Sequence, residues 1–221
     1  MHPSHSLAFS ILYEDDSILV VNKPAGLMVE PDRNGHPNLL QQVKRYLKND
    51  SLKEEVYAQH IHRLDRPVSG IVLFAKQRAV LKNLSEQFAE RKVKKFYQAL
   101  TVQEPALKTG TLEHWHRKEK KKAMLFKTQE SYTEKAQLNY EITKDGNLFL
   151  WKIQLHTGKY HQIRAQLASV DCPILGDSLY GSQEPYHENA IALDASELIF
   201  NHPLTNEKLQ MISGNHLKLK L

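Results

Sequence analysis

The chain has 221 residues, of which 41% are hydrophobic, and 30 basic against 25 acidic residues give it a net charge of +5. No apolar stretch approaches the roughly 18 residues that a membrane helix needs, so we expect no membrane span. The first ten residues lack a basic stretch followed by a long apolar run, so we expect no signal peptide. The single cysteine, Cys172, cannot form an internal disulfide, which favours a reducing, cytoplasmic setting.

The hydrophobic pattern predicts short strands and a few helices along the chain. Runs or alternations of apolar and β-branched residues predict strands at 18–21, 71–75, 96–102 and 149–155. A spacing of three or four predicts helices at 38–48, 78–91 and 161–170, and the last carries an apolar stripe of Ile163, Leu167 and Val170. Loops are expected at 104–112 and 180–189. These elements predict an α+β fold with a mixed, mostly antiparallel sheet.

Residues 60–70, HIHRLDRPVSG, place Asp65 between Arg63 and Arg66, just before a turn and a hydrophobic strand. Nearby cations favour the ionised form of a carboxylate. An ionised, positioned carboxylate can act as a nucleophile at a sugar or base carbon. The same Asp could instead cap a turn or form a salt bridge, and by composition alone this structural role is the more common one.

Two further segments combine polar or aromatic side chains with basic ones. Residues 157–164 follow a glycine turn with a polar helix start that could face either a cleft or water. In residues 93–100, Tyr97 follows Lys94 and Lys95, a combination that suits stacking on a base beside its phosphates, although a core tyrosine is the common alternative. The basic runs at 91–95 and 117–122 indicate either a polyanion-binding surface or a solvated face.

These segments resemble, in order, the motifs of the RluA-type pseudouridine synthases. HRLDRPVSGIVLFAK is similar to the catalytic motif, ILYEDDSILVVNKPAGLMVEP to the first motif, and VKKFYQAL to the tyrosine motif. TGKYHQIRAQLASVDCPILGDSLYG is similar to the last motif, and IALDASELIFNHP to the closing strand. The matches span about residues 11–203. They imply the pseudouridine-synthase catalytic fold with a central catalytic cleft, flanked by helices and loops, in a single domain over 1–221 without an S4 domain.

The resemblance implies an enzyme that isomerises specific uridines in structured rRNA or tRNA to pseudouridine, with no cofactor and no metal. It implies that Asp65 is the nucleophile, that Tyr97 packs against the target base and that Arg164 is the basic partner of Asp65. Arg63 stands where some members fill the space left by a flipped base. Further substrate contacts are implied at His62, Lys95, His161 and Gln162. The implied partner is an RNA stem-loop, with no obligatory protein partner, and we expect a monomer.

Some positions depart from the family pattern: Glu30 replaces a common His, Val68 a common Thr, Lys159-Tyr160 the usual Arg-Thr, and Asp194 a usual His. They bear on the choice of substrate more than on the chemistry.

Two other classes of function remain open. One is a non-catalytic RNA-binding protein that keeps the fold, against which the intact set of Asp65, Tyr97 and Arg164 argues. The other is a nucleoside or glycoside hydrolase, which typically needs paired carboxylates, whereas arginine cannot serve as the general acid. The pairs His60/His62 and His114/His116 lack a Cys or carboxylate at ligand spacing, so no metal site is expected.

Overall fold

The computed structural model describes residues 7–49, 56–215 and 217. Within this part no helix is both long and apolar enough to cross a membrane. The expectation of no signal peptide concerns residues 1–10, of which 1–6 lie outside the described residues. The helices are α1 (Leu39–Asn49), α2 (Arg78–Ala89), α3 (Gln162–Ala168) and the short 3-10 helix η1 (Ser178–Tyr180). The strands are β1 (Ser10–Glu14), β2 (Ile18–Lys23), β3 (Gln59–His60), β4 (Ser69–Ala75), β5 (Lys94–Thr101), β6 (Thr109–Glu119), β7 (Lys122–Phe126), β8 (Glu134–Asp145), β9 (Leu148–Leu155), β10 (Leu193–Asn201) and β11 (Lys208–Ile212).

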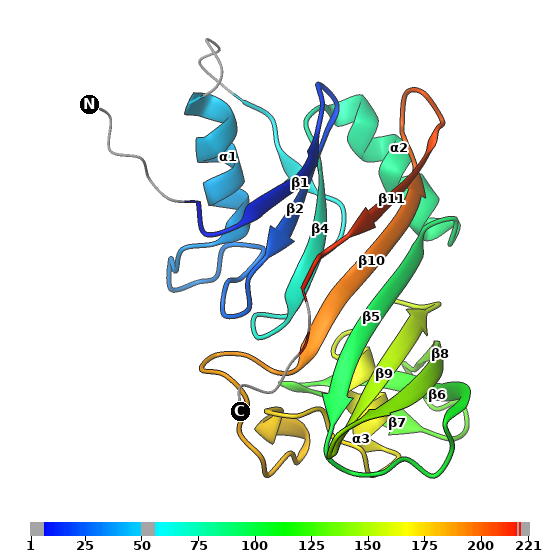
Figure 1. Cartoon of the computed structure of the whole chain (residues 1–221). Coiled ribbons are helices and arrows are strands. Elements are labelled where there is room, and N and C mark those ends of the chain that lie inside the picture. The colour runs from blue at the N-terminus through cyan, green and yellow to red at the C-terminus, as the bar shows by residue number, and fades with distance from the viewer. Residues whose placement is uncertain (1–6, 50–55, 216, 218–221) are drawn as a thin grey trace.

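The described strands form one sheet in the order β1-β2-β4-β10-β5-β9-β8-β6-β7, with β11 paired to β10 and β3 paired to β4 (Figure 1). Neighbouring strands are antiparallel, except that β4 and β10 are parallel. The expected α+β fold with a mixed, mostly antiparallel sheet is therefore confirmed. Helix α1 lies beside β1 and β2, whereas α3 lies beside β6 and β7 in the other half of the molecule (Figure 1).

Strict alternation along β2 and β4 divides the hydrophobic core between the two faces of the sheet. Leu19 and Val21 pack with the buried residues of α1, whereas Ile18 and Val20 pack with those of α2. Successive side chains of a strand point to opposite faces, so a run that is apolar throughout needs a cover on each side. The two helices supply these covers.

The junction of β4 and β10 is narrow, with only Ser69↔Asp194 and Gly70↔Ala195 in register. Gly70 has a φ of +117°, and a Cβ there would lie 2.5 Å from the backbone of Ala195, so no other residue fits. The fully buried Asp194 carboxylate accepts hydrogen bonds from Ser69 Oγ at 2.5 Å and Ser213 Oγ at 2.7 Å. The departure at Asp194 thus lies at a structural junction of the sheet.

Three expectations about elements were wrong. The expected loop 104–112 ends earlier, because β6 begins at Thr109; its exposed first half pairs with β8 and carries only Leu112 as a buried apolar residue. The expected helix 161–170 is shorter, because His161 adopts a left-handed φ of 51° and the helix ends at Ala168. Val170 lies beyond that end and is 37% exposed, so the apolar stripe of α3 consists of Ile163 and Leu167.

Candidate active site

Asp65 lies in the loop between β3 and β4, and the segment that follows β2 is hydrogen-bonded to the backbone of this loop. The carbonyl oxygen of Arg66 accepts hydrogen bonds from the Gly26 N–H at 2.8 Å and from Lys23 Nζ at 3.4 Å. The Lys23 ammonium is fully buried and also donates to the carbonyl oxygens of Pro24 and Leu27. Burial lowers the pKa of Lys23 to about 7. The sequence interpretation did not single out this lysine, whose three acceptors are all backbone atoms.

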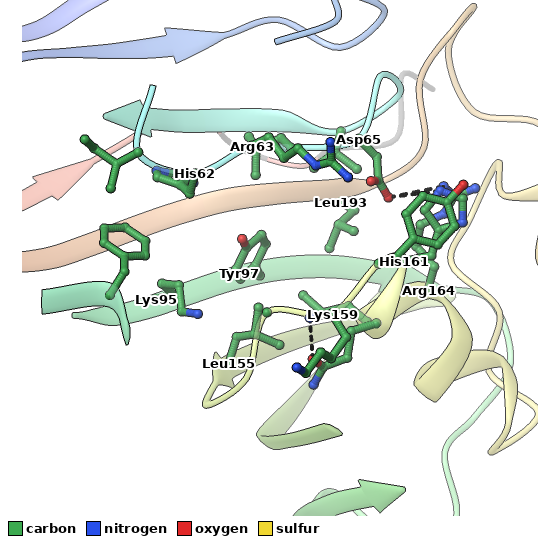
Figure 2. Close-up of a pocket in the computed structure, with 18 of the residues that line it drawn as sticks. His62, Arg63, Asp65, Lys95, Tyr97, Leu155, Lys159, His161, Arg164 and Leu193 are labelled. Carbon is green, nitrogen blue, oxygen red and sulfur yellow. Dashed lines mark hydrogen bonds and ion pairs between the residues drawn. The ribbon is translucent and has the colours of Figure 1, made fainter. Parts of the chain in front are cut away.

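The Asp65 side chain opens into a pocket of about 480 Å³ between this loop, β5 and the start of α3 (Figure 2). All eight residues that the sequence singled out line the pocket: His62, Arg63, Asp65, Lys95, Tyr97, His161, Gln162 and Arg164. Val68, one of the family departures, also lines it and is 2% exposed, so its side chain is part of the apolar wall. The fold thus brings together segments that lie far apart in the sequence.

Arg164 is the buried cation of the site and is only 5% exposed. Its Nε and Nη2 donate to the two carboxylate oxygens of Asp177, at 2.7 and 2.8 Å. Its Nη1 donates to Asp65 Oδ2 at 3.3 Å. The expected proximity of Arg164 and Asp65 is observed, and Asp177 is a further member of the site. The sequence interpretation included Asp177 only as one residue of the last motif, and this membership was the available signal.

His161 lies between Arg164 and Tyr180. Its Nε2 is 2.9 Å from Arg164 Nη1, and its Nδ1 is 3.1 Å from Tyr180 Oη. Because guanidinium nitrogens only donate, His161 Nε2 must accept, and the proton of the neutral ring is on Nδ1. Burial lowers the pKa of His161 to about 4, although Asp65 opposes this shift. His161 is therefore neutral near pH 7 and adds no charge to the pair.

Lys95 and Tyr97 are two positions apart in β5, so their side chains lie on the same face of the sheet. Both reach the pocket (Figure 2). Tyr97 is 9% exposed and also belongs to the hydrophobic core, so the core position that its sequence context allowed is observed together with the pocket lining. Burial, and then the charge of Asp65, raise the pKa of Tyr97, which keeps its hydroxyl protonated. Burial also lowers the pKa of Lys95, whose ammonium approaches Gly158 at the pocket wall.

His62 and Gln162 line the pocket, but their polar atoms bond within the protein. His62 Nε2 accepts the Leu73 N–H at 3.3 Å and its ring stacks on Phe88, while burial lowers its pKa to about 3. Gln162 Oε1 accepts from Thr157 Oγ1 and from the Lys159 N–H. Its Nε2 donates to Gln137 O and Gln166 Oε1. Both side chains therefore connect the segments that form the pocket wall.

Arg63 is held at the mouth of the pocket by Glu30, a position where the sequence departs from the family. Arg63 Nη1 lies 3.2 Å from Glu30 Oε2, and His60 Nε2 lies 3.2 Å from Glu30 Oε1. The arginine side chain is 60% exposed, so this ion pair is screened and weak.

The two basic runs differ in how much of their charge is free. In the run 117–122, Arg117 pairs with Glu119 and Lys118 lies over the ring of Tyr160. Lys120, Lys121 and Lys122, at the turn from β6 to β7, are exposed and have no ion pair among the described residues. In the run 91–95, Lys92 pairs with Glu90 and Lys95 turns into the pocket. Across residues 7–49 and 56–215, no three His, Cys, Asp or Glu side chains are grouped as metal ligands.

A mixed sheet that sets a carboxylate and a buried arginine in a basic pocket has counterparts among known proteins. The model of the RNA pseudouridylate synthase family matches residues 17–169. This is more than half of the chain, and the protein therefore belongs to the RNA pseudouridylate synthase family, as the sequence motifs predicted.

Curated relatives carry the same family name. The tRNA pseudouridine synthase C of Vibrio parahaemolyticus is 32% identical over 224 residues, which cover 91% of this chain and 88% of the relative. The dual-specificity RNA pseudouridine synthase RluA of Escherichia coli is 32% identical over 199 residues, which cover 87% of each chain. An uncharacterized RNA pseudouridine synthase of Aquifex aeolicus is 36% identical over 190 residues. That match covers 80% of this chain and 57% of the relative, so the chain spans little more than half the length of this relative.

Solved structures agree on the fold. The structure titled Human RNA Pseudouridylate Synthase Domain Containing 4 superposes with a TM-score of 0.75 at 23% identity, covering 95% of this chain and 88% of that chain. Human RNA Pseudouridylate Synthase Domain Containing 1 gives a TM-score of 0.76 at 20% identity, covering 97% and 86%. The expected pseudouridine-synthase fold is thus confirmed.

Proposed function

We propose that this protein is an RNA pseudouridine synthase that converts specific uridines of structured tRNA or rRNA into pseudouridine, with Asp65 as the nucleophile. One observation carries the proposal: the partly exposed Asp65 carboxylate faces the pocket and is held by a single nitrogen of the buried Arg164. This arrangement orients the carboxylate beside a buried cation while leaving one of its oxygens free of Arg164.

The reaction breaks the bond between ribose C1′ and uracil N1, turns the base and joins C1′ to C5. C5 loses its proton to solvent and N1 gains one, so the product is an isomer of the substrate. No electrons are gained or lost overall. Asp65 acts as the carboxylate that attacks the substrate, and Arg164 fixes its position. The Tyr97 hydroxyl stays protonated, so the side chain is uncharged. An uncharged aromatic ring suits packing against uracil while the base turns.

A uridine in a stem-loop must leave its stack to reach Asp65, at a cost of a few kcal/mol. The pocket of about 480 Å³ is in the size range of small-molecule sites. Arg63, which lies at the mouth of the pocket, would enter the space that the base leaves. Lys95 in the pocket and the three exposed lysines at the β6–β7 turn would bind phosphates. The chain is proposed to act as a monomer in one catalytic domain.

The test is a tritium-release assay on RNA transcripts that contain uridine tritiated at C5. Separate reactions use tRNA and rRNA transcripts, and each product is digested and analysed for pseudouridine and for free uracil. We expect tritium release and pseudouridine in equal amounts with wild type, and neither with Asp65→Asn. Free uracil without pseudouridine would indicate a hydrolase. RNA binding without either product would indicate a non-catalytic RNA-binding protein.

A further inference from the structure

Tyr160 lies in a three-layer stack that the proposed chemistry does not use. Its ring packs on the His161 ring, with centroids 3.8 Å apart and planes inclined by 16°. The Lys118 ammonium lies 4.4 Å from the centroid of the Tyr160 ring. Because His161 covers one face of the tyrosine, the ammonium lies at the other, in the geometry of a cation–π contact.

The same tyrosine is fastened to the β6–β7 hairpin at both ends. Its hydroxyl donates to the carbonyl oxygen of Lys121 at 3.3 Å, and its own carbonyl oxygen accepts from His116 Nε2 at 2.8 Å. Lys118 and His116 belong to β6, and Lys121 lies in the turn before β7. The hairpin that carries the exposed lysines is therefore attached directly to Tyr160.

At its inner side the stack meets the reacting groups. His161 Nε2 accepts a hydrogen bond from Arg164 Nη1 at 2.9 Å. Arg164 Nη1 also donates to Asp65 Oδ2. A shift of the His161 ring would therefore move the arginine nitrogen that holds Asp65. The usual family residue at position 160 is Thr, which has no ring and would leave this face of His161 uncovered.

We propose that Tyr160 is a positioning residue, which presses the His161 ring against Arg164 and thereby links the β6–β7 hairpin to the Asp65–Arg164 pair. The proposal rests on the proposed function and specifies how the Asp65–Arg164 pair is held in place. A chain of ring contacts restricts rotation of the imidazole, and small misplacements of catalytic groups are costly in rate.

Two variants separate the ring of Tyr160 from its hydroxyl. Tyr160→Thr removes the stack, and we expect the single-turnover rate to fall about tenfold, in line with the energy of an aromatic pair. Tyr160→Phe keeps the stack and removes an exposed hydrogen bond, so its rate should stay within about twofold of wild type. RNA affinity should change less than about twofold in both, since neither removes a phosphate-binding group. Tyr57→Thr is the matched control, because Arg78 lies over the Tyr57 ring and neither residue lines the pocket.

An NMR titration of the His161 imidazole in the RNA-free protein tests the same contact without any activity. The groups that face this ring are Asp65, Arg164, Tyr160, Tyr180, Asp177 and Lys118. Burial is the main cause of the low pKa of His161, so uncovering the ring in Tyr160→Thr should move that pKa back toward its ordinary value. The signal is assigned by its loss in His161→Gln.

A slow Tyr160→Thr with a shifted His161 titration, and a Tyr160→Phe that resembles wild type, would support the proposal. It is overturned if Tyr160→Thr retains both the wild-type rate and the wild-type titration. It is also overturned if Tyr160→Phe is as slow as Tyr160→Thr, since the hydroxyl would then matter and the stack would not. If wild type converts no RNA, the proposed function fails, whereas the titration still decides whether Tyr160 holds His161.

Discussion

Arg164 binds Asp177 through two nitrogens and Asp65 through one. The carboxylate of Asp177 is 1% exposed and takes Nε and Nη2 in a bidentate pair, whereas Asp65 is 27% exposed and takes only Nη1. Bidentate arginine–carboxylate pairs fix the plane of the guanidinium. Asp177 therefore determines where the remaining nitrogen points, and Asp65 keeps an oxygen available to a substrate.

The first prediction concerns the nucleophile. Asp65→Asn preserves size but removes the negative charge, so pseudouridine formation should fall at least about a thousandfold, or roughly 4 kcal/mol of barrier. Single-turnover assays on the preferred transcript measure the rate, and filter binding should show little change in RNA affinity. A variant that turns over near the wild-type rate would remove Asp65 from this role.

The second prediction concerns the clamp on Arg164. Asp177→Asn leaves a buried guanidinium without its main counter-charge, so the free energy of unfolding should fall by about 3 kcal/mol. The remaining charge of Asp65 should attract the guanidinium more closely, and the single-turnover rate should fall about tenfold or more, since misplaced groups react slowly. Urea unfolding and the tritium assay measure the two effects. The matched control is Asp171→Asn, at an exposed position after α3; equal behaviour of the two variants would contradict the clamp.

The third prediction concerns the exposed lysines of the hairpin. Replacing Lys120, Lys121 and Lys122 with Gln should weaken RNA binding and reduce the salt slope by about 0.7 to 0.9 for each phosphate that these side chains neutralise. The modified uridine should stay the same, because binding to phosphates carries no sequence information. The control neutralises three exposed residues of α1 that do not line the pocket, Lys44, Arg45 and Lys48. Equal salt slopes in both triple variants would assign the run to a solvated face.

The fourth prediction separates Arg63 from Tyr97. Stacking contributes about 1–3 kcal/mol per base, comparable with the few kcal/mol that extrusion costs. Arg63→Ala should therefore slow conversion of a folded stem-loop more than conversion of a short single strand, where no stack must be opened. Tyr97→Ala should slow both, because the ring is needed after the base has left its stack. Single-turnover rates of both variants on both RNAs decide the matter, and equal sensitivity of Arg63→Ala to the two substrates would exclude the wedge role.

The fifth prediction concerns the pH dependence of stability. Burial lowers the pKa of His62 to about 3, against an ordinary value of 6.5 in the unfolded chain. Below about pH 6.5 His62 binds a proton in the unfolded chain but not in the folded protein. The free energy of unfolding therefore falls as the pH is lowered from there toward 3. His62→Gln keeps an acceptor for the Leu73 N–H and removes the titration. It should be less stable at pH 7 but lose less stability between pH 7 and 5, as measured by urea unfolding; equal losses in both proteins would contradict this.

The sequence alone was sufficient for those features whose signal is local. Continuous apolar runs at 18–21 and 71–75 predicted the central strands, because a strand that is buried on both faces is apolar at every position. The motifs around Asp65, Tyr97 and His161–Arg164 predicted the family and the pocket residues, because each motif is a short contiguous segment.

Contacts between distant segments were decided only by the tertiary structure. Asp65 and Arg164 are 99 positions apart, and no pattern in either segment states their separation in space. The roles of three further residues depend on the side chains that they contact in the folded protein. Asp177 binds Arg164 and Glu30 pairs with Arg63, while the Tyr160 ring stacks on His161. The hairpin of β6 and β7 escaped prediction because its strands are largely exposed and pair with neighbours through backbone atoms, which every residue possesses. A side chain's environment is a property of the packed sheet, since burial, charge and hydrogen bonding arise only when the segments meet.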